Sequence, residues 1–87
     1  MSVPNTFHLV IASVGETRFD GAALSATFPG AAGEFTVLPH HEPLVTTLKK
    51  GTITVRLSGQ SENDGSKHYE IESGILECSD NRVVVLL

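Results

Sequence analysis

Two adjacent histidines and a glutamate between two prolines are the residues of this sequence best suited to do chemistry. They form the segment LPHHEPL: His40, His41 and Glu42, flanked by Pro39 and Pro43. Imidazole nitrogens and a carboxylate can hold a zinc ion, or they can move protons in general acid–base catalysis. The segment also fits a stiff surface corner between two strands, because each proline fixes φ and biases the residue before it toward extended geometry.

The backbone geometry of this segment disfavours a metal site. Neighbouring side chains of an extended segment point to opposite faces, so His40 and His41 cannot both reach one ion without a bend. His40 and Glu42 share a face, but a minimal zinc site would need a further ligand such as His68. The sequence has no His-x-His pair that could supply two ligands from one strand. We therefore expect surface histidines in a turn, with a small metal-binding protein as an alternative.

Other candidates for catalysis or cofactor binding are weaker. The only cysteine, Cys78, alternates with Leu76 in an apparent strand, which predicts a small core side chain rather than a nucleophile. No serine lies in a nucleophile-elbow pattern, and the glycines form no phosphate-binding loop. We therefore expect that the protein is not an enzyme and that it binds no cofactor.

Three glutamates on apparent strands could pair for acid–base work, but alternation with Ile71 and Ile75 predicts that they face solvent. They are Glu70, Glu72 and Glu77.

Length and charge narrow the possible classes of function. The chain has 87 residues, which predicts one domain over 1–87. Its net charge of −4, with scattered basic residues, argues against a nucleic-acid partner. A single cysteine excludes an internal disulfide, and no apolar run approaches the roughly 18 residues of a membrane helix. These features favour a reducing, cytoplasmic location.

Short β-rich runs punctuated by Gly, Pro, Asn and Asp predict an all-β fold, an antiparallel sandwich or barrel. In TITVRL, residues 52–57, alternation predicts a half-buried strand with Ile53 and Val55 inward. The polar segment 58–66 predicts a hairpin loop, and Asp80-Asn81 is a turn pair. The expected strands cover 6–13, 16–20, 23–30, 33–39, 43–51, 52–57, 67–73, 74–79 and 81–87.

Several segments together resemble the epsilon subunit of F-type ATP synthases. A glycine and an acid precede apolar positions and Pro-x-His-x-Pro-Leu, and the turn LKKG follows at 48–51. YEIESGILE at 69–77 resembles the aromatic strand that runs into Gly-Ile-Leu-Glu in the family. FHLVIAS at 7–13 and NRVVVLL at 81–87 resemble the first and last strands of the family's N-terminal domain. The residues of the first motif are Gly33, Glu34, Phe35, Pro39, His41, Pro43 and Leu44.

The resemblance implies a flattened antiparallel β-sandwich of about ten short strands. It implies a non-catalytic subunit of the central stalk, or rotor, that binds the gamma subunit and rests on the c-subunit ring. Such a subunit couples proton or sodium flow to ATP synthesis. It would lie at the cytoplasmic face of a bacterial membrane, which it would meet only through the complex.

Matching positions also imply contact residues. Glu34 is the strongest candidate for the c ring, whose polar loops carry basic residues in the family, and His41 is a packing residue toward gamma. The residues implied for the c ring are Gly30, Ala31, Ala32, Gly33 and Glu34, and those implied for gamma are Ser13, His41, Pro43 and Thr46.

Two features depart from the family. Most members continue into a helical hairpin that senses ATP and can brake the motor, whereas this sequence ends at Leu87. We therefore expect neither nucleotide binding nor an intrinsic brake. His40 stands where the family more often has glycine, which suggests a stiffer corner and leaves the local backbone shape open.

A stand-alone β-sandwich module that binds sugar or peptide is a further alternative. It would need an exposed aromatic platform, and the chain has no Trp, one Tyr and four Phe.

Overall fold

The computed structural model describes residues 5–57 and 66–87. Within these ranges the chain forms eight β-strands and no helix, so the all-β prediction is confirmed with fewer strands than the ten expected. No described segment is a helix capable of crossing a bilayer. The predicted loop at 58–66 lies outside the described residues except for Ser66. The strands are β1 (Phe7–Ser13), β2 (Glu16–Gly30), β3 (Gly33–Val37), β4 (Leu44–Leu48), β5 (Gly51–Leu57), β6 (Ser66–Ile71), β7 (Gly74–Ser79) and β8 (Arg82–Leu86).

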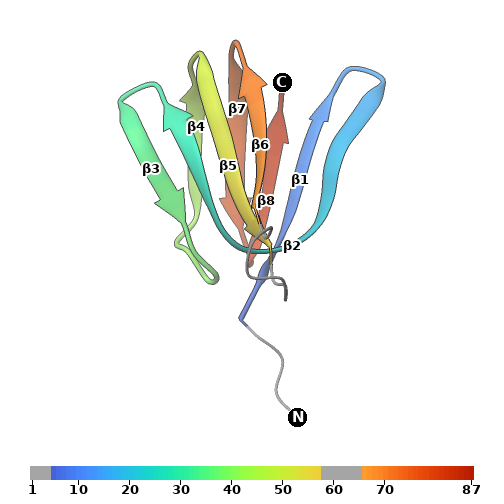
Figure 1. Cartoon of the computed structure of the whole chain (residues 1–87). Helices are drawn as coiled ribbons and strands as arrows, with labels where there is room; N and C mark the ends of the chain where they lie inside the picture. The colour runs from blue at the N-terminus through green and yellow to red at the C-terminus, as the bar shows by residue number, and fades with distance from the viewer. Residues whose placement is uncertain (1–4, 58–65) are drawn as a thin grey trace.

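Strand β2 belongs to both layers of the sandwich and explains the lower strand count. The sequence predicts two strands separated at Gly21, but β2 runs through this glycine and curves between the layers (Figure 1). Its first half pairs with β1, and its second half pairs with β3 on one side and β5 on the other. A register shift between Ala23 and Ser25 lies at the crossing, where an irregularity of this kind bends a strand.

Two sheets result, and they meet along β2. The first sheet has the order β2–β1–β8–β7–β4, and the second has the order β3–β2–β5–β6. Seven of the eight strand pairings are antiparallel, as predicted. The exception is β1 with β8, which run parallel with Leu9 opposite Val83. The two ends of the chain meet here, and side-chain alternation carries no information about strand direction.

Side-chain alternation places one face of each sheet in a common core. On β1, Phe7, Leu9 and Ile11 are buried, and on β5, Ile53 and Val55 are buried as predicted. Burial of each large aliphatic or aromatic side chain contributes about 1.5–3 kcal/mol. The remaining buried apolar residues are Ala23, Ala26, Phe28, Val37, Leu48, Ile71, Leu76, Cys78, Val83 and Val85.

Two-residue turns connect several strands. Asp80 and Asn81 join β7 to β8, and both have left-handed backbones, with φ of 51° and 61°. Two consecutive positive φ angles are typical of a type I′ hairpin turn, in which Asn and Asp are well tolerated. The predicted turn pair is therefore confirmed.

Candidate functional site

The tip of the β2–β3 hairpin, residues 30–34, contains all five residues implied for the c-ring contact. Gly30 and Gly33 face each other across the hairpin, and Ala31 and Ala32 form the turn between them. Gly30 is buried, whereas the other four residues of the tip, including Glu34, are exposed. The tip lies at the upper left of Figure 1. Glu34 is its only carboxylate, and this side chain is exposed to solvent.

Backbone contacts fix the tip against β4. The Ala31 N–H donates to the Thr47 carbonyl oxygen at 3.0 Å, and the Lys49 N–H donates to the Pro29 carbonyl oxygen at 2.8 Å. A Cβ atom at Gly30 would lie 2.7 Å from the Gly33 carbonyl oxygen, so the close hairpin requires glycine here. The exposed residues of the tip therefore project from a fixed backbone.

The corner, defined as residues 38–43, lies at the opposite end of the sandwich from the tip, below β3 in Figure 1. Its His41 is half-buried, and the Nδ1 atom donates to the Glu42 carbonyl oxygen at 2.7 Å. The His40 N–H donates to Oδ1 of Asn81 at 2.7 Å. The corner is thus tied to the β7–β8 turn, and Pro43 is exposed beside His41.

His40 has a left-handed backbone with φ of 65°. This conformation costs an L-residue about 1–2 kcal/mol, whereas glycine adopts it freely. The corner therefore keeps a backbone suited to glycine although it carries histidine.

The substitution His40→Gly is expected to raise the free energy of unfolding by about 0.5–1 kcal/mol. Relief of backbone strain outweighs the greater freedom of glycine in the unfolded chain, which opposes the gain by roughly 0.5–1 kcal/mol. Urea denaturation followed by circular dichroism measures this change. Glu42→Gly is the control and should destabilise, because Glu42 has no positive φ. An unchanged or lower stability of the His40 variant would contradict a strained corner.

The four residues implied for the gamma contact are spread along the first sheet. His41 and Pro43 lie together in the corner, whereas Ser13 ends β1 at the same end of the molecule as the tip (Figure 1). Thr46 is half-buried in β4 and pairs with the buried Leu76, so it belongs to the inward-facing row. The structure therefore brings two of the four residues together.

The outer face of the first sheet, which lies between these residues, is mainly apolar. Val45, Ile75 and Leu86 have 70%, 52% and 56% of their surface exposed. Val10 and Val84 are half-buried beside them. The strand registers form two rows across the sheet: Val10, Val84, Glu77 and Val45, then Ala12, Leu86, Ile75 and Thr47.

The outer face of the second sheet is polar by contrast. Thr27 and Thr36 share a hydroxyl–hydroxyl hydrogen bond of 2.8 Å, and Oγ1 of Thr54 lies 3.3 Å from Nδ1 of His68. No aromatic platform covers it, because all five aromatic side chains are buried or half-buried: Phe7, Phe19, Phe28, Phe35 and Tyr69. The two outer faces therefore differ in chemistry, with exposed apolar side chains on the first sheet and hydroxyl and imidazole groups on the second.

Residues considered for metal binding are not assembled in the structure. His68 lies in β6 against Thr54, whereas His40 lies in the corner. Across residues 5–57 and 66–87, no group of three His, Cys, Asp or Glu side chains could hold an ion.

The three glutamates considered for acid–base work are all exposed, as predicted. Ile75 was expected to face inward between them, but it lies on the outer face together with Glu77.

Cys78 is buried in the core, which confirms its predicted role as a small packing residue. Burial raises the pKa of the thiol above its ordinary value of 9.0. The folded state therefore favours the neutral thiol.

We expect stability to decrease as the pH rises above about 9, because the unfolded thiol ionises before the folded one. Urea denaturation at pH 8 and pH 10 measures the decrease. Cys78→Ala should lower stability at both pH values but should show a smaller decrease between them. The same decrease in both proteins would contradict a raised pKa in the folded state.

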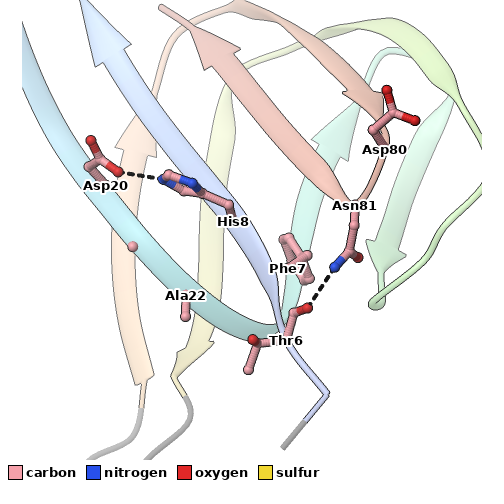
Figure 2. A pocket seen from close by; sticks show the side chains of 8 residues that line it. Thr6, Phe7, His8, Asp20, Ala22, Asp80 and Asn81 are labelled. Atoms are coloured by element: carbon pink, nitrogen blue, oxygen red, sulfur yellow. Dashed lines mark hydrogen bonds and ion pairs between the residues drawn. The ribbon is translucent and has the colours of Figure 1, made fainter. Parts of the chain in front are cut away.

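An open pocket of about 450 Å³ lies at the end of the first sheet, beside the β7–β8 turn (Figure 2). His8 and Asp20 approach within 2.5 Å on its wall, and both side chains are largely exposed. Such an exposed pair contributes about 0–1 kcal/mol. The pocket lining is Thr6, Phe7, His8, Asp20, Gly21, Ala22, Asp80 and Asn81.

The apolar outer face of the first sheet was not predicted, although the sequence contains a signal for it. LVIA at 9–12 and VVVLL at 83–87 are continuous apolar runs rather than alternating ones. Continuous runs are typical of strands covered on both faces. The five large residues missed are Val10, Val45, Ile75, Val84 and Leu86.

The family model described as "ATP synthase, Delta/Epsilon chain, beta-sandwich domain" matches residues 6–87. The chain is 36% identical over 83 residues to an ATP synthase epsilon chain of Delftia acidovorans, covering 94% of this chain and 56% of that protein. It is 33% identical over 82 residues to an epsilon chain of Herminiimonas arsenicoxydans, with the same coverage. The chain thus spans about half the length of these relatives.

Solved structures share the fold. A chain of the Euglena gracilis mitochondrial ATP synthase, in a structure of OSCP, F1 and the c-ring, gives a TM-score of 0.82 at 23% identity. The match covers 99% of this chain and 52% of that one. A chain of the Tetrahymena thermophila mitochondrial central stalk and c-ring gives 0.72 at 14% identity, covering 91% and 60%. With the matched family model and relatives, the chain belongs to the family of β-sandwich domains of ATP synthase delta and epsilon chains.

Proposed function

We propose that this chain is a non-catalytic central-stalk component of a bacterial F-type ATP synthase. In this role it binds the gamma subunit and the c-subunit ring and couples ion translocation to ATP synthesis. It lies peripherally at the cytoplasmic face of the membrane. Family membership supports assignment to the synthase, and the two different outer faces support a role in binding other subunits.

The observation that carries the gamma contact is the apolar outer face of the first sheet. Val45, Ile75 and Leu86 expose more than half of their surfaces, while the second sheet covers its outer face with hydroxyl and charged groups. Burial of each such side chain by a partner contributes about 1.5–3 kcal/mol. A standard interface of about 1,600 Å² in total includes about 800 Å² from each partner. This face, extended by the corner, would form the apolar centre of such an interface.

The corner and the end of β1 extend this face in the proposed gamma contact. His41 and Pro43 border it at one end, and Ser13 borders it at the other. Thr46 lies in β4 next to the exposed Val45, where it orients the strand from the inner side. We expect Val45 to touch gamma directly and Thr46 to act through the position of β4.

The tip carries the proposed c-ring contact. Glu34 is exposed on a hairpin that backbone hydrogen bonds hold against β4. A rim pair between Glu34 and a basic loop residue of the c ring contributes about 0–1 kcal/mol, so it sets orientation more than affinity. The tip and the corner lie at opposite ends of the sandwich (Figure 1), so one domain can hold both partners at once.

Co-elution with the gamma subunit of the same organism in size-exclusion chromatography tests the proposal. We expect a one-to-one complex that persists at 0.3 M salt, because the contact is mainly apolar and is screened little. Separate elution at both low and high salt would refute the gamma contact. A metal titration and a glycan-binding assay would then test the two alternative functions.

A further inference from the structure

Asn81 in the β7–β8 turn connects two segments that are distant in sequence. Its Oδ1 accepts a hydrogen bond of 2.7 Å from the His40 N–H, and its Nδ2 donates one of 2.9 Å to the Thr6 carbonyl oxygen (Figure 2 shows the second). The partners fix the orientation of the amide, because a backbone N–H can only donate and a carbonyl oxygen can only accept. One side chain therefore joins the corner to the entrance of β1.

The backbone around Asn81 holds this side chain in place. Its φ of 61° is a conformation that asparagine tolerates well, and its carbonyl oxygen accepts a hydrogen bond of 3.2 Å from the His8 N–H. Asn81 is half-buried, so its amide is partly shielded from competing water. The neighbouring Asp80 has a similar φ of 51°, but its exposed carboxylate has no hydrogen-bond partner among the described residues.

The Oδ1 atom of Asn81 accepts its hydrogen bond from the strained residue of the corner, His40. His40 has φ of 65°, and it is the N–H of this same residue that donates to Asn81. A strained backbone persists only where the surrounding contacts hold it. Among the described residues, the bond to Asn81 is the hydrogen bond that ties His40 to the body of the sandwich.

We propose that Asn81 is a positioning residue that holds the corner in its left-handed turn and so fixes His41 and Pro43 beside the outer face of the first sheet. The consequence for binding rests on the proposed gamma contact. A corner that is already in its bound conformation loses less conformational entropy when a partner binds. Loss of the Asn81 side chain should therefore free the corner and weaken gamma binding without removing any residue of the contact.

Asn81→Gly and Asp80→Gly form a matched pair for the test. Both replace a residue of the same turn by glycine and keep the left-handed backbone, but only the first removes the bridge. In the free chain, amide hydrogen exchange followed by NMR should become about fivefold faster at His40 in Asn81→Gly and stay within about twofold in Asp80→Gly, since one hydrogen bond is worth about 1 kcal/mol. Equal exchange at His40 in Asn81→Gly and the unsubstituted chain would overturn the proposal.

A second variant covers the case in which Asn81→Gly folds poorly. Asn81→Asp keeps an acceptor for the His40 N–H but replaces the donor to Thr6 by an oxygen. We expect His40 to keep its slow exchange in this variant, while Asn81→Ser, whose shorter side chain cannot span both partners, loses it. Fast exchange in Asn81→Asp would show that the acceptor does not hold the corner and would also overturn the proposal.

Binding to gamma then separates this inference from the function on which it rests. We expect Asn81→Gly to weaken the complex about tenfold in a titration, and Asp80→Gly to leave it unchanged. Equal affinity of the two variants and the unsubstituted chain for gamma, with faster exchange at His40 in Asn81→Gly, would contradict the proposal that Asn81 strengthens gamma binding by holding the corner. If the unsubstituted chain does not bind gamma, the proposed function fails, while the exchange result still decides whether Asn81 holds the corner.

Discussion

Replacement of Ile75 by lysine is expected to abolish co-elution with the gamma subunit while the domain remains folded. Ile75 is 52% exposed at the centre of the apolar outer face, next to Leu86 in the strand register. The substitution removes an apolar contact worth about 1.5–3 kcal/mol and places a charge where water is excluded on binding. We expect the dissociation constant to rise at least about 100-fold, which corresponds to roughly 3 kcal/mol.

Thr52→Lys is the matched control for this prediction. Thr52 is an exposed strand residue on the outer face of the second sheet, opposite Glu70, where a lysine can be accommodated. We expect its affinity for gamma to stay within about twofold, because rim and remote charges change affinity little. Isothermal titration calorimetry compares the two variants, and circular dichroism checks their folds. A larger loss of affinity for gamma in Thr52→Lys than in Ile75→Lys would contradict this prediction and would indicate that gamma binds the second sheet.

Replacement of Phe28 by alanine is expected to cause the largest loss of stability. Phe28 is fully buried where β2 lies between β3 and β5, and its ring centroid is 5.6 Å from that of Phe35. Truncation of a buried phenylalanine costs about 3–5 kcal/mol, because transfer free energy is lost and a cavity remains. The total stability of a domain this small is about 5–10 kcal/mol, so a large share of it would be lost.

Urea denaturation monitored by circular dichroism measures this loss, with Phe28→Leu as the control. Leucine keeps much of the apolar volume, so we expect roughly half of the loss or less. The dependence on urea concentration should stay the same in both variants, since the same surface is exposed on unfolding. A loss below about 1 kcal/mol in Phe28→Ala would mean that the core can close around the missing ring, and that the two layers are less tightly packed than the structure indicates.

Local patterns predicted most of the strands, because alternation and turn chemistry act over a few residues. Ile53 and Val55 alternate with polar neighbours, which was enough to place β5 and its inward face. Asp80 and Asn81 identified the β7–β8 turn, because these residue types tolerate the left-handed backbone that such a turn requires. The same reasoning failed at Gly21, where a glycine typical of a turn lies inside a continuous strand.

The implied contact residues were predicted unevenly. The turn of the tip is local, because the predicted strands 23–30 and 33–39 leave only Ala31 and Ala32 between them, but its contact with the c ring was implied by the resemblance. Thr46 and Ser13 were implied by resemblance alone, and the structure places Thr46 on the inward-facing row and Ser13 far from the corner. The proposed roles of Thr46 and Ser13 therefore depend on their position next to the apolar outer face of the first sheet, because the two residues do not lie together.

The choice of a sandwich was implied by the family resemblance, whereas local patterns predicted an all-β fold, most strand boundaries and the inward position of Cys78. These properties follow from side-chain alternation and from the φ preferences of Gly, Pro, Asn and Asp, which act locally. The tertiary structure is needed to show that β1 runs parallel to β8, because pairing between the two ends of the chain leaves no local trace. It also decided that Val45, Ile75 and Leu86 share one face, and that Asn81 meets His40. The shared face and the contact between Asn81 and His40 depend on which strands become neighbours. The packing of the whole domain determines which strands these are.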